Sequence, residues 1–362
     1  MEILLIVAVA LLSFANGSND NFKGVATLWG AGRTSYNRAL AWATAFTFLG
    51  SLLAAGLATS LAAKFNGSAL VAREVYAQVP FLAAVGLGAA GAVLLASRLG
   101  FPISTTHALT GALVGAGTLA AGFSGVKFAA LGSGVVTPLL FSPLVSLALT
   151  LGLYPLVVRA AEASAKRDCV CVDEASVVAI PAGAAATVAV AAPAVRWTAA
   201  ENCETGAEVA RFNPGDALHW LSGAAISFAR GLNDTPKIAA LLLLTGAGAM
   251  QANYLLVALA IAAGGMLGAA RVAQTLSRKI TPMATREAVT ANLVSAALVT
   301  LASGYALPVS TTHVTSGSIF GIGLLRRSEA DWKRVRDIVL SWVATLPLGA
   351  ALAAFSYWLL MQ

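Results

Sequence analysis

Two polar motifs, each present twice, contain the residues of this chain that could do chemistry. The first motif is an Asn-Asp pair followed by a Lys three residues after the Asp, inside an apolar segment. Its two copies are Asn19, Asp20 and Lys23, and Asn233, Asp234 and Lys237. An ionised side chain within a bilayer costs about 2.5–3.5 kcal/mol on insertion scales, so such residues are candidate functional groups. Asp and Lys three residues apart can neutralise each other on one helical face, but neutralisation does not explain the repetition beside Asn. The motif therefore predicts a binding site.

The second motif, Pro-x-Ser-Thr-Thr-His, precedes two Gly-spaced apolar runs. Its hydroxyl residues are Ser104, Thr105 and Thr106 in one copy, and Ser310, Thr311 and Thr312 in the other. The preceding Pro cannot continue a helix, so each copy predicts a helix N-terminus, whose free amides and positive dipole end favour a tetrahedral oxyanion. Capping a helix needs one hydroxyl, whereas here three occur in a row twice. We expect two facing N-termini to hold one anion between them.

His107 and His313 complete the two copies of the second motif. Their imidazoles could donate to the anion or carry a proton, since histidine titrates near physiological pH, or they could be neutral and orient the motif through a carbonyl. The residues favour neither reading. We predict no metal site because no carboxylate or Cys has suitable spacing. We predict no catalytic residues, and hence no enzyme, because a nucleophile, base and orienting group do not occur in a recognised order.

The composition indicates what surrounds these motifs. Of the 362 residues, 58% are hydrophobic and 11% are charged, whereas soluble domains contain about 25% charged residues. This excludes an ordinary soluble enzyme, and the long apolar runs fit helices rather than an outer-membrane barrel. The 34 Gly suit closely packed transmembrane helices. The net charge of +7 comes from basic residues that lie mostly in short loops, where they set topology, so we exclude nucleic acid as a partner.

Several apolar stretches are shorter than the about 20 residues that a spanning helix needs. Because these short stretches flank the polar motifs, we predict helices that are broken at the motifs. The stretches are residues 3–29, 39–63, 79–99, 107–123, 128–158, 217–229, 235–272, 288–303, 314–325 and 337–361.

Residues 159–215 differ in composition from the rest of the chain. They contain charges, prolines and strand-like alternation in VCVDEASVVAI, so we predict a cytoplasmic linker with a small β hairpin. It separates an N-terminal membrane repeat, residues 1–158, from a C-terminal membrane repeat, residues 216–362. All three cysteines fall in the linker, and we predict free thiols because the cytoplasm is reducing. They are Cys169, Cys171 and Cys203.

The two halves of the chain contain both motifs in the same order. FANGSNDNFKGVATL aligns with FARGLNDTPKIAALL, and GFPISTTHALTGALVGAG aligns with ALPVSTTHVTSGSIFGIG. Such a duplication is typical of transporters built from inverted repeats around a central site. The predicted fold is therefore an all-α polytopic membrane protein, with two inverted repeats, broken helices and two opposed re-entrant hairpins.

The loop charges agree with this topology. If the STTH segments are the tips of re-entrant hairpins and the N-terminus is outside, most basic residues fall on the cytoplasmic side, as the positive-inside rule requires. The residues predicted inside are Arg33, Arg38, Arg159, Lys166, Arg167, Arg271, Arg278, Lys279, Arg286, Arg326, Arg327, Lys333, Arg334 and Arg336. Those predicted outside are Lys64, Arg73 and Lys127.

Both motifs resemble those of the inorganic phosphate transporter (PiT) family, over essentially everything but the linker. The resemblance implies uptake of inorganic phosphate with Na⁺ or H⁺. It implies that Asp20 and Asp234 are the motif carboxylates, and that Ser104–Thr106 and Ser310–Thr312 belong to phosphate-binding hairpins. The chain departs from the family where Lys23 and Lys237 replace an Asn. We hypothesise that the usual pair of Na⁺ ions is not used, and that the lysines either balance the Asp residues or attract the oxyanion directly.

The sequence therefore predicts a multi-pass secondary transporter of inorganic phosphate in the plasma (inner) membrane, with its N-terminus outside. We expect ion-coupled uptake by alternating access, with H⁺ or Na⁺ as coupling cation and no other cofactor. Phosphate and membrane lipids are the expected partners, and a homodimer is left open. A permease for another tetrahedral oxyanion such as sulfate, and an anion channel, are the alternative functions.

Overall fold

The computed structural model describes residues 1–164, 169–173, 177–182, 185–190, 195–198, 208–244, 246, 249–278, 283–325 and 331–362. Most of these residues are helical. The long helices are α1 (Glu2–Asp20), α3 (Tyr36–Leu57), α6 (Val79–Leu99), α7 (Thr105–Ala121), α9 (Thr137–Ser164), α10 (Pro214–Leu243), α11 (Met250–Gly268), α13 (Thr285–Gly304), α14 (Thr311–Leu325) and α15 (Trp332–Leu360). The short ones are α2 (Ala26–Gly30), α4 (Thr59–Ala62), α5 (Arg73–Tyr76), α8 (Phe128–Leu131) and α12 (Ala270–Arg278), with single turns at Lys23–Val25, Phe123–Gly125 and Gly132–Val136.

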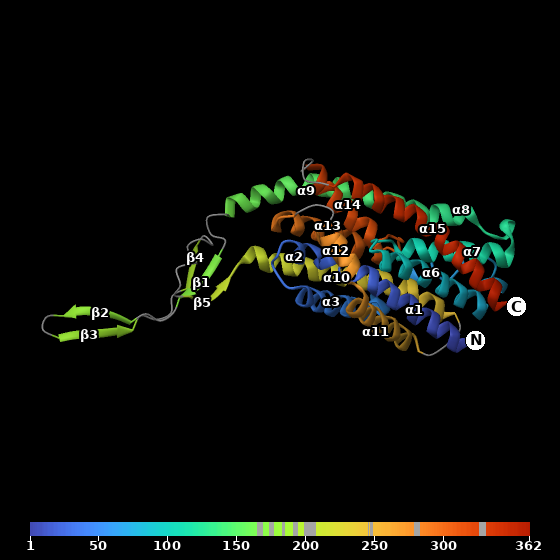
Figure 1. Cartoon of the computed structure of the whole chain (residues 1–362), viewed down its shortest axis with the longest axis horizontal. Coiled ribbons are helices and arrows are strands. Elements are labelled where there is room, and N and C mark those ends of the chain that lie inside the picture. Colours follow the sequence, from blue (N-terminus) through green and yellow to red (C-terminus); the bar gives the residue numbers. More distant parts are fainter. Residues whose placement is uncertain are drawn as a thin grey trace.

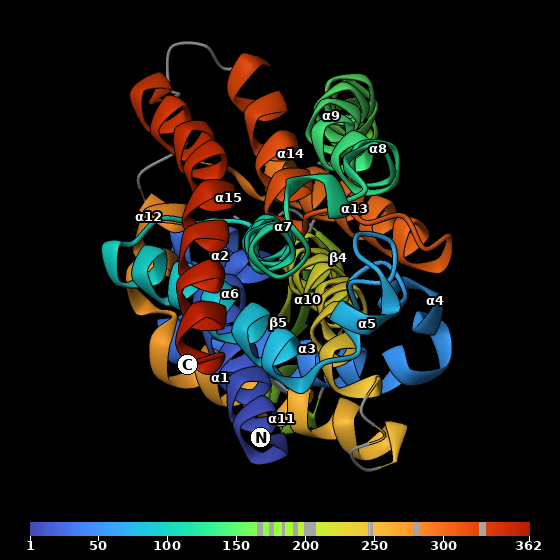
Figure 2. The ribbon, with the colours of Figure 1, turned by 90° about the vertical axis from the view of Figure 1, so that its right-hand side faces the viewer.

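Seven helical segments of the described chain are long and apolar enough to cross a membrane, in agreement with the predicted polytopic helical fold. They are Glu2–Gly30, Tyr36–Leu57, Val79–Leu99, Phe128–Arg159, Met250–Gly268, Thr285–Gly304 and Val335–Leu360. The 30-residue α10 is not among them, although Figure 2 shows it in the middle of the helices. It contains charged and polar residues along its length, and nearly all of its second half is buried. Its polar residues therefore face protein rather than lipid.

The helix break predicted at the first motif occurs in only one half. In the first half, α1 ends at Asp20, and a single turn at Lys23–Val25 precedes α2. In the second half, α10 continues through the motif to Leu243. At one equivalent position the first half has Gly24, which is a poor helix former, whereas the second half has Ile238. The apolar stretch predicted over 235–272 is divided instead near Gly246, whose φ of +65° suits glycine.

The second motif lies in short turns between contacting helices. α6 is followed by α7 and α13 by α14, and each pair is joined by only five or six residues. Gly100 ends α6 with a left-handed φ of +77°, which a residue without a Cβ adopts readily. Each turn then passes through a Pro, so its chain is extended before the next helix begins. We call these two turns, residues 100–104 and 305–310, the tips.

Five strands lie between α9 and α10: β1 (Cys169–Asp173), β2 (Val177–Ala182), β3 (Ala185–Val190), β4 (Val195–Thr198) and β5 (Glu208–Phe212). β1 pairs antiparallel with β4 and β5, and β2 pairs antiparallel with β3. Figure 1 shows these strands projecting from one end of the helices, while both chain termini lie at the other end. The cytoplasmic location of this segment stays a prediction, as do the domain boundaries.

The prediction of free thiols is wrong for Cys171, which is disulfide-bonded. Cys169 is a free, buried thiol. Disulfide formation depends on the distance between Cα atoms in the folded chain, which sequence spacing does not reveal. Other sequence predictions fall outside the described residues, namely those on Cys203, Lys166, Arg167, Lys279, Arg326 and Arg327.

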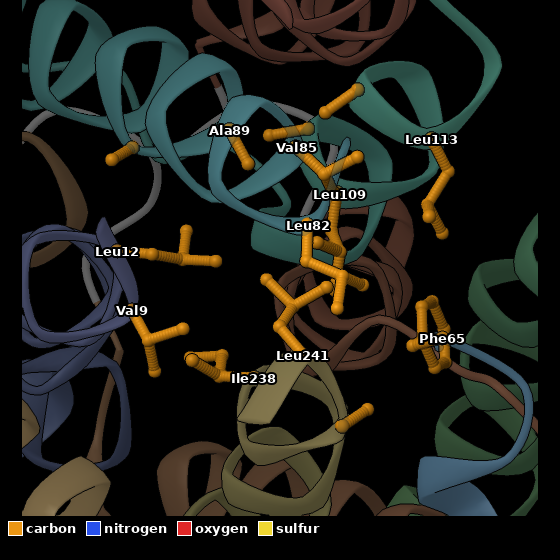
Figure 3. Close-up of a cluster of buried hydrophobic side chains, with 14 of the residues drawn as sticks. Val9, Leu12, Phe65, Leu82, Val85, Ala89, Leu109, Leu113, Ile238 and Leu241 are labelled. Carbon is orange, nitrogen blue, oxygen red and sulfur yellow. The ribbon is translucent and has the colours of Figure 1, made fainter. Parts of the chain in front are cut away.

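The largest apolar core joins the two halves of the chain. Figure 3 shows Val9 and Leu12 of α1 and Leu109 of α7 pointing toward Ile238 and Leu241 of α10. All five side chains are buried. Ile238 and Leu241 directly follow the second Asn-Asp-Lys motif, so this packing holds the motif of α10 against the first half of the chain.

Close helix approaches depend on glycine. In the contact between α1 and α11, a Cβ on Gly264 would collide with the carbonyl of Phe14, and one on Gly17 would collide with the carbonyl of Ile261. Small residues let helix backbones approach in this way, and dispersion then replaces the hydrophobic effect that is lacking in lipid. α1 carries the first motif, so this contact also positions Asp20.

Gly264→Ala is expected to destabilise the protein by about 1–3 kcal/mol, since the added methyl overpacks a closed contact. Thermal unfolding of purified protein in detergent measures the effect. Gly152→Ala in α9 is the matched control, because a Cβ there meets nothing within 4 Å, and it should leave the melting temperature unchanged or slightly raised. Equal melting temperatures for both variants would contradict the close-packing explanation.

Candidate functional site

Lys23 is buried beside the first tip. Its Nζ donates to Asp20 Oδ1, to the Ile103 carbonyl (3.1 Å) and to Asn19 Oδ1 (3.4 Å). A fourth partner, Thr312 Oγ1, comes from the other half of the chain. The ammonium is thus surrounded by a carboxylate, an amide oxygen, a backbone carbonyl and a hydroxyl.

Lys237 has the equivalent environment in the second half. Its Nζ donates to the Val309 carbonyl (2.6 Å) and to Thr106 Oγ1 (2.9 Å), and lies 3.6 Å from Asp234 Oδ1. Val309 occupies the position in the second tip that Ile103 occupies in the first. Thr106 and Thr312 are equivalent in the same way. Each lysine therefore binds the carbonyl of its own tip and the threonine of the opposite motif.

The two threonines also join the tips directly. Thr312 Oγ1 donates to the Ile103 carbonyl at 2.7 Å, and Thr106 Oγ1 donates to the Val309 carbonyl at 3.5 Å. Motifs that are about 200 residues apart in sequence thus meet in one buried cluster. The structure brings together both Asn-Asp-Lys motifs and both STTH motifs, although their roles as substrate ligands stay predictions.

The motif asparagines hold the tips. Asn19 accepts from the Ile103 amide (3.0 Å) and donates to the Phe101 carbonyl (2.9 Å) and to Ser97 Oγ (3.0 Å). In the second half, Asn233 accepts from Ser303 Oγ (3.1 Å), while its Nδ2 lies 3.4 Å from the Val309 carbonyl. Ser97 and Ser303 occupy equivalent positions near the ends of α6 and α13. Both asparagines therefore fix the tips to the helices that carry the carboxylates.

The serines of the STTH motifs cap their helices. Ser104 Oγ accepts from the His107 amide (3.1 Å), and Ser310 Oγ accepts from the His313 amide (3.2 Å). The first turn of a helix has further amides without intrahelical partners; in α7 and α14 these include the amides of the first threonines, Thr105 and Thr311. Both threonines are buried. Thr105 Oγ1 also lies 3.4 Å from Asp20 Oδ2.

Asn16 was not singled out from the sequence, yet it connects the two carboxylates. Its Nδ2 lies 3.1 Å from Asp20 Oδ2, 3.2 Å from Asp234 Oδ2 and 3.0 Å from Thr105 Oγ1. Its Oδ1 is buried and has no partner. Asn16 precedes Asp20 by one helical turn, so its place on the same face of α1 could have been read from the spacing.

Arg230 is the second residue that the sequence reasoning missed. It occupies the position in the second half that Asn16 occupies in the first. Its Nη2 donates to Asn21 Oδ1 and Thr47 Oγ1, both at 2.7 Å, while its buried Nε and Nη1 have no partner. An ionisable side chain in an apolar segment is the signal that identified Asp20. Arg230 could have been found by the same rule.

The cluster has an excess of positive charge. Lys23, Lys237 and Arg230 oppose Asp20 and Asp234, which leaves one net positive charge when all five are ionised. Charge effects are strong at such depth because water does not screen them. The cluster is thus suited to an anion rather than to a further cation.

The rings of the two motif histidines contact each other at a tilt of 37°. The ring centroids of His107 and His313 are 4.5 Å apart, and the ring of His313 lies 4.0 Å from that of Trp342. His313 Nδ1 lies 3.3 Å from the Leu139 carbonyl, which can only accept, so this nitrogen is the donor. This bond agrees with the orienting role for His313. His107 Nδ1 and His313 Nε2 are buried without a partner.

The cluster contains amides of helix N-termini and hydroxyls, which are groups that suit an oxyanion. Among the described residues, no group of three or more His, Cys, Asp or Glu lies close enough together to hold a metal ion. Asp20 and Asp234 are instead paired with lysine ammonium groups.

Known proteins resemble this chain over most of its length. Residues 4–353 match the model of the phosphate transporter family. The chain is 25% identical to a probable low-affinity inorganic phosphate transporter of Bacillus subtilis, over 99% of this chain and 97% of that protein. It is 26% identical to inorganic phosphate transporter 2-1, chloroplastic, of Arabidopsis thaliana, over 95% and 69% of the two chains. A solved structure titled "The sodium-dependent phosphate transporter" has the same fold, with a TM-score of 0.76 and 19% identity over 99% of this chain and 98% of that one.

A double-mutant cycle is expected to reveal the coupling of Asp20 and Lys23. Asp20→Asn leaves a buried ammonium uncompensated and should cost about 3–5 kcal/mol, whereas Asp20→Asn combined with Lys23→Met removes both charges and should recover much of that loss. Thermal unfolding in detergent measures each step.

The control for this cycle is Asp337→Asn, which removes one partner of the partly exposed pair with Arg336 and should change stability by less than about 1 kcal/mol. Strictly additive effects of the Asp20 and Lys23 substitutions would show that the two charges are not coupled.

Proposed function

The chain belongs to the phosphate transporter family, and on this premise we propose that it carries inorganic phosphate across the plasma membrane as an ion-coupled secondary transporter. The observation that supports this most is the meeting of two helix N-termini within one buried, net positive cluster. Free amides at a helix N-terminus favour an anion, and hydroxyls beside them suit the oxygens of phosphate. Thr105, Thr106, Thr311 and Thr312 are the residues proposed to bind it.

Helix directions support an inverted arrangement of the two motifs. α7 packs parallel to α15, and α14 packs parallel to α9. Figure 1 shows that α9 ends at the strands, whereas α15 ends at the opposite end of the molecule. α7 and α14 therefore run in opposite directions, and their N-termini face each other. The contacts that give these directions are Gly111 with Leu346, Gly115 with Ala350, Gly317 with Pro143, and Gly321 with Leu147.

We propose that alternating access works through the bonds between the tips. The bonds of Thr312 to Ile103 and of Thr106 to Val309 close the cluster from both sides. Separation of one tip from the carboxylate helices would open the cluster to one side, while the other tip keeps it closed. Coupling to a proton or a Na⁺ ion would bias which side opens. The buried state of all these residues corresponds to a closed step of such a cycle.

Ser104→Ala combined with Thr105→Ala is expected to weaken phosphate binding without preventing membrane insertion. Bonds to a charged ligand contribute about 1.5–3 kcal/mol each, so the dissociation constant should rise about tenfold or more. Binding of radiolabelled phosphate to purified protein measures it. Ser133→Ala with Thr137→Ala, at exposed positions of the segment that leads into α9, is the matched control. Unchanged affinity in the first variant would remove this tip from the site.

Transport measurements on the purified protein in liposomes test the two alternative functions, a general oxyanion permease and an anion channel. Competition by sulfate as strong as by phosphate would indicate a general oxyanion permease, because amides and hydroxyls do not exclude sulfate. Currents far above transporter turnover without saturation would indicate a channel.

We propose that the strand segment is cytoplasmic and that the N-terminus is outside. The support is the positive-inside rule, because the basic loop residues are predicted to lie at the end of the helices that carries the strands. In a variant without cysteines, Val195→Cys in exposed β4 should react with a membrane-impermeant thiol reagent only after cells are permeabilised, whereas Phe123→Cys at the other end should react in intact cells. Disulfides are typical of oxidising compartments, so the bond at Cys171 favours the opposite orientation. Labelling of Val195→Cys in intact cells would reverse the proposed topology.

A further inference from the structure

The lysine ammonium groups occupy pockets lined by oxygen. Lys23 Nζ has four oxygen partners, and Lys237 Nζ has three. Carboxylate, carbonyl and hydroxyl oxygens are also the ligands of hard metal cations, and backbone carbonyls of unwound segments coordinate the coupling ions of many transporters. The Ile103 and Val309 carbonyls lie in such unwound segments, the tips.

We propose that Lys23 and Lys237 are built-in cations that fill two monovalent-cation sites, so that phosphate transport by this chain does not use Na⁺ at these positions. The inference rests on the proposed transport of phosphate and specifies its coupling. Each ammonium supplies the single positive charge that a bound Na⁺ would supply, but it is tethered to α10 or to the turn after α1 and cannot dissociate.

The geometry distinguishes this role from direct binding of the oxyanion. An ammonium has three N–H donors. Lys23 has four oxygen acceptors from the protein within hydrogen-bonding distance, whereas Lys237 donates to two oxygens and lies 3.6 Å from Asp234 Oδ1 as an ion pair. Lys23 therefore has no donor left for a substrate oxygen in this conformation, and the charge of Lys237 is compensated by Asp234. The lysines therefore neutralise the carboxylates, and the amides at the two helix N-termini are left for phosphate.

The charges of the cluster oppose entry of a further cation. A Na⁺ ion that bound Asp20 or Asp234 would lie within a few ångströms of an ammonium, and like charges repel strongly where water is excluded. Without its lysine, each carboxylate would instead remain buried and uncompensated among oxygen ligands. Such a site attracts a small cation.

The experiment measures Na⁺ binding and Na⁺ dependence in parallel. Radiolabelled Na⁺ is titrated against purified protein, and phosphate uptake into liposomes is compared in Na⁺ and in choline at fixed pH and membrane potential. The variant Lys23→Asn/Lys237→Asn empties both pockets. Lys64→Asn/Lys127→Asn, at exposed positions, is the matched control.

The wild type and the control are expected to show no saturable Na⁺ binding and equal uptake in Na⁺ and in choline. The double Asn variant should gain saturable Na⁺ binding, and adding Asp20→Asn and Asp234→Asn to it should abolish the gain. Saturable Na⁺ binding by the wild type that Asp20→Asn abolishes would overturn the proposal. So would a folded double Asn variant, monodisperse in detergent, that binds no Na⁺.

Na⁺ binding by the wild type tests the proposal even if the variants do not fold. If the wild type transports no phosphate, the proposed function is wrong. The role of the lysines is still tested in that case, because Na⁺ binding is measured separately. Phosphate uptake that rises steeply with Na⁺ would leave phosphate transport standing and overturn the built-in cations.

Discussion

The compensation of buried charge is the constraint on which the rest of this structure depends. Asp20, Asp234 and their lysines lie where water cannot screen them, so each charge needs partners from the protein. Those partners come from both tips and both halves of the chain. The lysine of each half donates a hydrogen bond to the second threonine of the other half's STTH motif. The charged cluster thereby determines where the two tips lie, and it places two helix N-termini opposite each other.

The remaining features serve to hold that cluster. Gly17 and Gly264 let α1 and α11 approach closely, and the apolar core around Leu12 and Ile238 holds α10 against the first half. The two halves are similar but not identical. Asn16 joins the carboxylates on one side, whereas the equivalent Arg230 adds a cation on the other. When all five groups are ionised, this difference leaves the cluster with a net positive charge, which suits an anionic substrate.

Much of the fold and of the candidate site was predictable because the motifs carry local signals. Pro before a run of hydroxyl residues indicates a capped helix N-terminus, and the structure has Ser104 and Ser310 as caps. The continuous helix through the second Asn-Asp-Lys motif was not predictable from such local signals. α10 continues through it because Ile238 replaces a glycine and because its polar residues find tertiary partners. The disulfide at Cys171 likewise depends on distances that a sequence does not contain.

The sequence by itself determined that this chain is a helical membrane protein with duplicated polar motifs, since composition and local spacing act over a few helical turns. It also identified the carboxylates, lysines and hydroxyls of the cluster. Only the tertiary structure decided which oxygens surround each ammonium. Two roles were open for Lys23 and Lys237, balancing the carboxylates or binding the anion. The choice depends on how many acceptors lie within hydrogen-bonding distance, and these come from segments that are far apart in the chain.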